Sequence, residues 1–188
     1  VVVPIATLVG TVAGYVGGVA DEVLMRTVEI LQVLPAIVVY FVAILVYGRS
    51  LLLLVVVFGL TSWGGVARVV RAETLRLRER EYVTASRAAG GSGVHVLRHH
   101  VVRNVSSTVL PAVTLQIPTV IFVEAGLAFL DLSDPELLSW GNVIAQGITH
   151  FNTRWWVATV PLVVLVVTLL AFNVLGDTLR DVLDPRLE

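Results

Sequence analysis

The four histidines of this sequence are the side chains whose types and spacing could bind a metal ion. His95 and His99 are four residues apart, a spacing that places two imidazoles on one face of a helix. No glutamate lies between them, and neither His100 nor His150 completes an evident third ligand position. Surface histidines in a basic loop are therefore the default interpretation, and we expect no bound metal.

Glu124 is the one carboxylate inside a strongly apolar run. Its apolar neighbours are Ile121, Phe122, Val123, Leu127 and Phe129. An ionisable group is costly in hydrocarbon, so we expect Glu124 to face the protein interior, a cavity or the outer rim. One interpretation is a pathway or gate residue, and the alternative is a buried hydrogen-bond acceptor that ties helices together.

The sequence offers little for catalysis. It contains no cysteine, which removes thiolate metal sites and cysteine nucleophiles. It contains no lysine, so a glycine-rich phosphate loop followed by lysine is absent, as is a Gly-x-Ser-x-Gly turn. We predict that this chain is not an enzyme and does not bind and hydrolyse ATP alone.

Long apolar segments must position these residues. Of the 188 residues, 56% are hydrophobic and only 14% are charged, the mean hydropathy is +0.89, and the net charge of −1 gives no sign of nucleic-acid binding. Five segments approach the ~20 residues that a bilayer-spanning helix requires. They are residues 1–19, 31–46, 51–70, 108–130 and 155–175. These runs are too long for strands and predict an all-α, polytopic transmembrane helical bundle that forms one domain over residues 1–188.

The arginines predict how this bundle is oriented. All 13 basic residues are arginine, and eight of them lie from Arg68, near the end of the third segment, to Arg103, before the fourth. Cytoplasmic loops are enriched in basic residues, so we place a loop of about residues 76–104 inside and a loop of about residues 131–153 outside. Only Arg49 and Arg154 are then external. The chain begins inside an apolar run, from which we expect that earlier residues are missing.

Small residues and turn formers predict how the first segments pack. Gly10, Gly14 and Gly18 recur every four residues, a pattern that lets helix backbones approach closely. Their contact is either within the chain or with a second membrane subunit. Asp21 is the expected N-cap of the following helix, and Pro35 predicts a kink.

Residues 84–103 resemble the cytoplasmic loop of ABC-importer permeases that is often called the EAA loop. The family pattern is Glu-Ala-Ala, three further residues and Gly, followed about ten residues later by a hydrophobic pair and Pro. Thr84-Ala85-Ser86 occupy the first positions, Gly90 is the glycine, and Val101-Val102-Arg103 occupy the last positions. Two of the first three residues and the final proline are substituted.

Further motifs along nearly the whole chain are similar to C-type permeases of the dipeptide, oligopeptide and nickel group. They are Gly14 to Gly18 with Asp21, Arg71 to Glu73, Arg78 to Tyr82, Glu124 to Leu130, Ser139 to Asn142, and Phe172 to Asp177. The resemblance implies the type I permease fold with six membrane helices, of which this chain shows five and lacks the first. It also implies a multi-pass protein of the prokaryotic inner membrane.

The resemblance further implies a permease subunit that couples closure of ATPases to alternating access. Its implied partners are a second permease subunit, two cytoplasmic ATP-binding subunits and an external substrate-binding protein, with ATP and Mg bound by the partners and no cofactor bound by this chain. A coupling helix would run from about Thr84 to Val94. Its ATPase-coupling residues would be Thr84, Ala85, Ser86, Arg87, Ala88, Ala89 and Gly90. The cargo stays open among dipeptides, oligopeptides, nickel and sugars, and the main alternative is a secondary transporter or channel subunit that ATP does not power.

Overall fold

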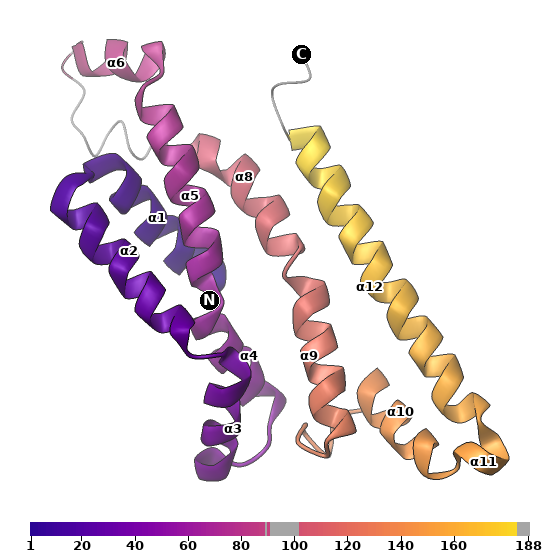
Figure 1. The fold of residues 1–188 in the computed structure, drawn as a ribbon. Helices are drawn as coiled ribbons and strands as arrows, with labels where there is room; N and C mark the ends of the chain where they lie inside the picture. Colours follow the sequence, from indigo (N-terminus) through magenta and orange to yellow (C-terminus); the bar gives the residue numbers. More distant parts are fainter. Residues whose placement is uncertain (89, 91–101, 184–188) are drawn as a thin grey trace. The chain divides into compact units, whose positions relative to one another are not determined.

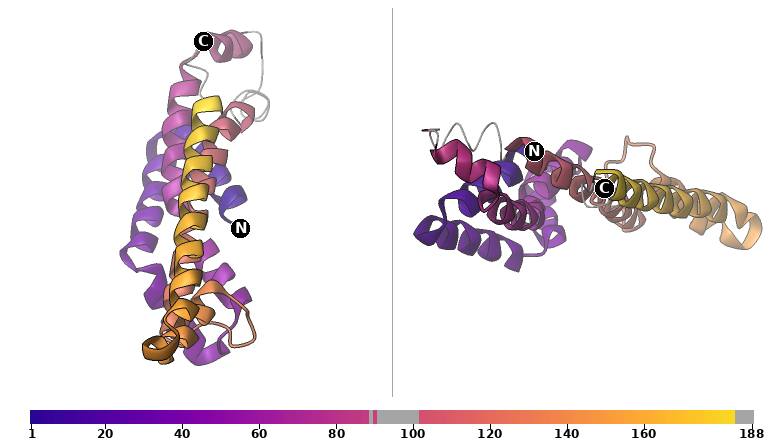
Figure 2. Two further views of the ribbon diagram at one scale, coloured as in Figure 1. Left: turned by 90° about the vertical axis from the view of Figure 1, so that its right-hand side faces the viewer. Right: turned by 90° about the horizontal axis from the view of Figure 1, so that it is seen from above.

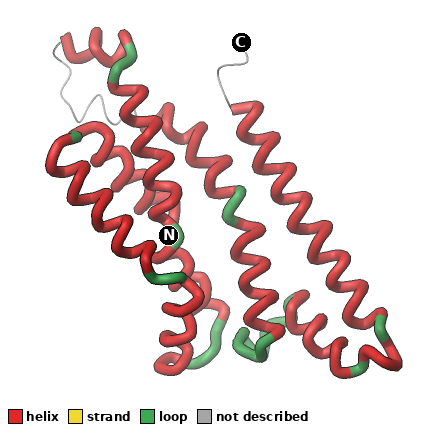
Figure 3. The backbone as a smooth tube through the Cα atoms, viewed as in Figure 1, coloured by secondary structure: helices red, strands yellow, loops and turns green. Residues whose placement is uncertain are grey.

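The computed structural model of the chain describes residues 1–88, 90 and 102–183. This part is built from helices and contains no strand, which confirms the all-α prediction (Figure 3). The helices are α1 (Val2–Val16), α2 (Gly18–Val33), α3 (Ala36–Tyr47), α4 (Leu51–Thr61), α5 (Trp63–Arg78), α6 (Glu81–Ala88), α8 (Val102–Thr114), α9 (Ile117–Phe129), α10 (Trp140–Thr149), α11 (Phe151–Arg154) and α12 (Trp156–Leu183).

Three stretches of helix are long and apolar enough to cross a membrane by themselves. They are Leu51–Arg78, Asn104–Phe129 and Trp156–Leu183, and they correspond to the third, fourth and fifth predicted segments. The second predicted segment, residues 31–46, covers the end of one helix and most of the next, Gly18–Val33 and Ala36–Tyr47, which bend by 67° where they meet. The described residues thus supply three spanning helices, or four if the bent pair is one span, and the apolar helix α1 has 15 residues.

The bend between α2 and α3 lies at the predicted proline. Pro35 is the N-cap of α3 and has an extended backbone, with ψ 130°, and Leu34 before it is also extended, with ψ 117°. Proline lacks an amide hydrogen and disfavours helical geometry in the residue before it, so the helix must end here and start again. The expected kink at Pro35 is confirmed.

Contacts divide the chain into two compact units. Unit 1 comprises residues 1–34, 59–113 and 177–188, and unit 2 comprises residues 35–58 and 114–176, the described parts of which are considered in turn. In unit 1, α1 and α2 form a hairpin packed beside α5, and α6 lies across the end of α5 (Figures 1 and 2). The unit 1 core is apolar and consists of Ala6, Val28, Trp63, Val66, Ala67, Val70, Leu77, Val105 and Val109.

Two glycines permit the close approach of α1 and α5. A Cβ atom on Gly10 would lie 2.5 Å from the Ala67 carbonyl oxygen, and one on Gly14 would lie 2.7 Å from Cβ of Thr74. The predicted glycine face thus meets α5 of the same chain at these two positions. Gly18 lies instead in the turn between α1 and α2, has φ 56°, and has no atom within 4 Å of its ideal Cβ position.

Asp21 is not an N-cap, which corrects the sequence-based expectation. The N-cap of α2 is Gly17, whose φ is 71°. Helix α2 therefore starts at Gly18, because the glycine pair can adopt the positive φ angles that a tight turn requires. Asp21 lies within the first turn of α2, and its carboxylate pairs with Arg71 of α5.

In unit 2, a second apolar core joins α3, α4 and α9. Its buried members are Tyr40, Leu54, Val57, Phe58 and Leu127. Helix α10 packs closely on α9 and α12 through glycines, since a Cβ on Gly141 would lie 2.6 Å from the Ala125 Cα and one on Gly147 would lie 2.6 Å from the Ala158 nitrogen. The loop predicted at about residues 131–153 contains the short helix α10, and Ser139 caps this helix by accepting a hydrogen bond from the Asn142 amide at 3.2 Å.

Candidate functional site

The first candidate site is the short helix α6, which follows the last turn of α5 in unit 1. The chain turns at Glu79 and Arg80, where the Arg80 amide donates to the Leu77 carbonyl at 3.1 Å and the Val83 amide donates to the Arg80 carbonyl at 3.0 Å. Helix α6 then spans Glu81–Ala88. It begins three residues before the predicted coupling helix, whose residues 91–94 lie outside the described part.

The described side chains of α6 differ sharply in exposure. Val83 is 0% exposed, whereas Thr84 and Ala85 are exposed and Ser86 is half-buried. Gly90 follows in a turn with φ 86°, a left-handed conformation that favours glycine. The side chains of Arg87 and Ala88, and the whole of Ala89, lie outside the described part. The small exposed side chains leave a surface that another protein can approach closely.

Helix α6 follows α5 directly and is hydrogen-bonded to α8, the next helix that the structure describes. The Asn104 amide of α8 donates a hydrogen bond to the Tyr82 hydroxyl of α6 at 3.3 Å. The Arg78 guanidinium, at the last residue of α5, donates to the carbonyls of Gly14 and Tyr15 at 3.3 and 3.5 Å. Helices α5 and α8 both belong to long apolar spans, so α6 follows one span in the sequence and is hydrogen-bonded to the start of another.

The second candidate site is a cavity of about 600 Å³ within unit 2. Helices α4, α9, α10 and α12 and the residues just before α10 line it. Its lining residues are Leu51, Leu54, Val55, Val120, Ile121, Glu124, Leu137, Leu138, Ser139, Trp140, Val143, Leu165 and Thr168. Nearly all of these side chains are apolar, so Glu124, Ser139 and Thr168 supply the few polar groups on its wall.

Glu124 is half-buried in this cavity. Its carboxyl group is within hydrogen-bonding range of the Ser139 hydroxyl, whereas its Oε1 atom is buried and has no hydrogen-bond partner. The Ser139 contact agrees with a role in tying α9 to the start of α10. Glu124 also lines the cavity, and its buried, unpartnered oxygen agrees with a pathway or gate role, because buried polar groups normally find a partner.

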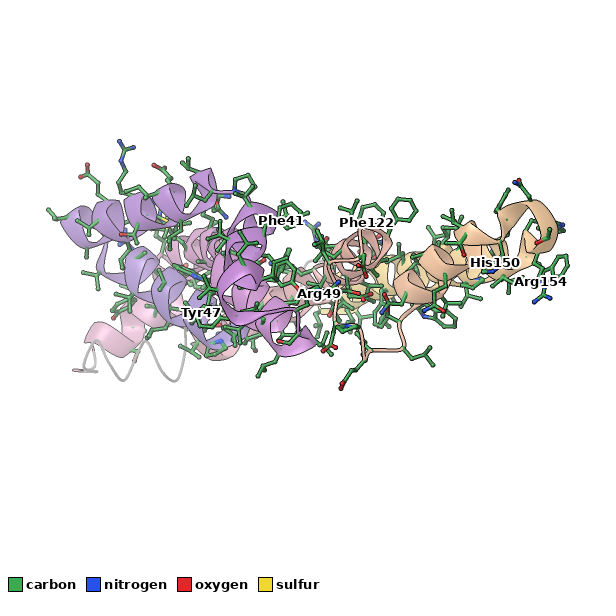
Figure 4. All side chains as sticks on the ribbon, turned by 90° about the horizontal axis from the view of Figure 1, so that it is seen from below. Phe41, Tyr47, Arg49, Phe122, His150 and Arg154 are labelled. Carbon is green, nitrogen blue, oxygen red and sulfur yellow. The ribbon has the colours of Figure 1, made fainter. Side chains whose placement is uncertain are left out.

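The turn between α3 and α4 is fastened to the loop after α9. Arg49 donates to the Asp131 carbonyl oxygen and forms an ion pair with the Asp131 carboxylate at 3.2 Å. The Leu51 amide donates to the Asp134 carboxylate at 3.1 Å. The two segments must therefore lie on the same side of the membrane, which agrees with the arginine distribution. Figure 4 shows Arg49 in the part of unit 2 that contains α3 and α4.

The Asn142 side chain organises the loop of residues 133–139, a role that the sequence pattern alone does not predict. Its side-chain amide donates to the carbonyls of Leu137 and Asp134 at 2.7 and 3.3 Å, and its carbonyl oxygen accepts from the Ser133 hydroxyl at 3.0 Å. The signal available in the sequence was its place three residues after a Ser N-cap. These hydrogen bonds hold residues 133–139 against α10, which forms part of the cavity wall.

Three of the four histidines that were predicted to be surface residues lie outside the described part, namely His95, His99 and His100. His150 follows α10 and is exposed near Arg154, at the far end of α10 and α11 in Figure 4. Within residues 1–88 and 102–183, no group of three His, Cys, Asp or Glu side chains could hold a metal ion.

Comparison with known proteins supplies the family. Residues 6–188 match the family described as binding-protein-dependent transport system inner membrane component. The chain is 35% identical to the oligopeptide transport system permease protein OppC of Bacillus subtilis over 97% of its length and 60% of that protein's. It is 36% identical to the dipeptide transport system permease protein DppC of Bacillus subtilis, with 97% and 58% covered. It is 39% identical to OppC of Escherichia coli K12, with 90% and 57% covered.

The chain thus spans about three fifths of the length of these relatives. The match extends over α1 to α12, so it includes both α6 and the cavity of unit 2. The apolar helices are those of a multi-pass membrane protein. The chain belongs to the family of binding-protein-dependent transport system inner membrane components.

Proposed function

We propose that this chain is a permease subunit of an ATP-driven importer and that α6 is the element through which the ATPase subunits act on it. The observation that carries the proposal is the placement of α6. It presents Thr84 and Ala85 to its surroundings, while Val83 is buried and Tyr82 is hydrogen-bonded to Asn104 of the next helix. A helix that is hydrogen-bonded near its start and exposes small side chains suits a groove on a second protein.

The mechanism follows from how α6 is attached. The energy comes from ATP, which two partner subunits bind together with Mg. This chain has no lysine for a phosphate loop, so in this proposal it is not itself the ATPase. Closure of those subunits displaces α6, and α5 and α8 tilt with it. The two orientations of the helices are the two states whose populations ATP binding shifts. A second permease subunit and an external substrate-binding protein complete the assembly.

The cargo we propose is a peptide. The relatives at 35–39% identity are named oligopeptide and dipeptide permeases. Their similarity covers 90–97% of this chain, so it includes the permease-like motifs described above. Within the permease, Glu124 is the proposed gate residue, because it lines the cavity of unit 2 and has a buried carboxyl oxygen without a hydrogen-bond partner. Nickel complexes remain the second cargo to test.

The decisive experiment introduces bulk and charge into α6. Ala85 is exposed, so Ala85→Arg leaves the fold of unit 1 intact and obstructs docking in a groove. Gly90→Pro removes the left-handed conformation at φ 86°, which proline cannot adopt. We expect both variants to insert normally and to lose ATP-dependent peptide uptake in vesicles that contain the full set of subunits.

Val182→Arg is the matched control, because Val182 is 76% exposed beyond the last charged residues of α12. It should transport normally. Full uptake by Ala85→Arg and Gly90→Pro would defeat the coupling role of α6. Uptake without ATP, or failure of an ATP-binding subunit to co-purify with the wild type, would favour a secondary transporter or channel instead.

A further inference from the structure

The turn between α1 and α2 is held against α5 by two arginines, Arg71 and Arg78. Arg71 of α5 binds the Asp21 carboxylate with two nitrogens, Nε at 2.5 Å and Nη2 at 2.6 Å. The two side chains are 34% and 16% exposed, so the pair is largely shielded from water. A two-pronged contact between a guanidinium and a carboxylate fixes direction as well as distance.

The second arginine acts on the other side of the same turn. Arg78 donates from Nη1 to the carbonyls of Gly14 and Tyr15, which belong to the last turn of α1. The last four carbonyls of a helix have no partner within the helix, so an arginine here supplies missing hydrogen bonds. Glycine at position 17 leaves room for this contact, because the Cβ atom of any other residue there would lie only 3.2 Å from Nη1 of Arg78.

The two arginines share one face of α5. They are seven residues apart, which is two helical turns or about 10 Å along the axis. Between them Thr74 of α5 packs against Gly14 of α1, with 2.7 Å from the Thr74 Cβ to the ideal Cβ position of Gly14. Three contacts therefore hold the turn. They are the ion pair of Asp21 with Arg71, the packing of Thr74 on Gly14, and the hydrogen bonds from Arg78 to the last turn of α1.

We infer that Arg71 and Arg78 are positioning residues that make the α1–α2 hairpin move together with α6. Arg78 is the last residue of α5 and directly precedes the turn of Glu79 and Arg80 into α6, so a displacement of α6 reaches this arginine first. The inference rests on the proposed function, since it concerns how a push on α6 spreads through unit 1. Without the arginines, α5 moves and the hairpin follows it only through apolar contacts.

Distance measurements test this inference without any transport assay. The chain has no cysteine, so Val19→Cys and Glu81→Cys place spin labels at two exposed positions, one just after the turn and one at the start of α6, outside the proposed docking residues. In the assembled transporter we expect one narrow distance distribution that is the same without nucleotide and with ATP. Adding Arg71→Ala should broaden the distribution and make it depend on nucleotide. An unchanged distribution in Arg71→Ala would overturn the inference.

Transport by charge-exchanged variants provides a second test. Asp21→Asn and Arg71→Ala should assemble at normal levels and hydrolyse ATP, whereas peptide uptake per assembled complex falls roughly tenfold, equivalent to ~1.4 kcal/mol of lost coupling. Asp21→Arg combined with Arg71→Asp re-forms the pair and should restore most of the uptake. If uptake, ATP hydrolysis and assembly fell in parallel without rescue, the pair would serve stability only and the inference would be wrong.

Arg26→Ala is the matched control for these variants. Arg26 also pairs with an acidic residue, Glu29 at 3.1 Å, but the two side chains are 76% and 56% exposed on α2 itself. Its loss should leave both the distance distribution and uptake unchanged. A wild-type complex without ATP-driven uptake would reject the proposed function, whereas an active wild type with unaffected Arg71 variants would reject only this inference.

Discussion

Replacing Gly10 by alanine tests whether the close contact of α1 with α5 holds unit 1 together. The added Cβ atom would lie 2.5 Å from the Ala67 carbonyl oxygen and 2.6 Å from the Val70 Cβ. Ordinary van der Waals contact begins at 3.4 Å, so the two helices must separate by about 1 Å. Backbone and Cβ atoms form this contact, and rotation of a side chain cannot relieve it.

Two opposing terms set the magnitude. Alanine is favoured over glycine within a helix by about 1 kcal/mol. Forcing an extra carbon into a packed contact costs about 1–3 kcal/mol, and a rigid backbone contact belongs at the upper end. We therefore expect Gly10→Ala to lower the free energy of unfolding by about 1–2 kcal/mol.

Gly65→Ala is the matched control within unit 1. Gly65 lies in α5 as well, but a Cβ atom there meets only the Gln32 amide nitrogen, at 4.0 Å. This variant should gain helix stability without any clash, by about 1 kcal/mol at most. Unfolding of the purified chain in increasing mole fractions of SDS, followed by circular dichroism, measures both values. The reasoning fails if Gly10→Ala is at least as stable as Gly65→Ala.

Three further variants probe the remaining contacts. Glu124→Gln should change basal ATP hydrolysis or uptake in the assembled transporter, and unchanged values for both would leave Glu124 as a structural acceptor. Asn142→Leu leaves the Ser133 hydroxyl and two carbonyls without the Asn142 side chain as partner. The free energy of unfolding, measured by thermal denaturation, should therefore fall by ~2–3 kcal/mol. A loss below ~0.5 kcal/mol would contradict the role assigned to Asn142. Tyr82→Phe removes the hydrogen bond to Asn104 and should lower uptake while α6 remains folded, so uptake equal to that of the wild type would show that this bond does not transmit force.

Local patterns sufficed for the elements of this fold. The apolar runs predicted the long helices, and the break at Pro35 follows from the chemistry of proline alone. The ends of the long helices extend beyond the prediction, because hydropathy stops where charges begin. Helix α5 continues to Arg78, since Thr74 and Leu77 are buried against the rest of unit 1 and the arginines at its end complement the helix dipole.

The contacts that join distant segments could not be predicted. Aspartate is a residue type that is favoured at helix N-caps, which explains the expectation for Asp21. Its actual partner, Arg71, is fifty residues away, and no local rule links the two. Glu124 was recognised as exceptional because a carboxylate in an apolar run has few structural roles. The cavity that it faces depends on four helices, and only their packing reveals it.

The apolar part of α12 has a defined length. Trp155 and Trp156, whose rings meet edge to face at 6.1 Å, mark one end, and Asp177 marks the other. The helix between them measures about 30 Å at 1.5 Å per residue, close to the hydrocarbon thickness of a typical bilayer. Short-chain lipids would oblige this helix to tilt, since tryptophan and aspartate both favour the interface. The acyl-chain length chosen for reconstitution is therefore a variable that acts on the protein itself.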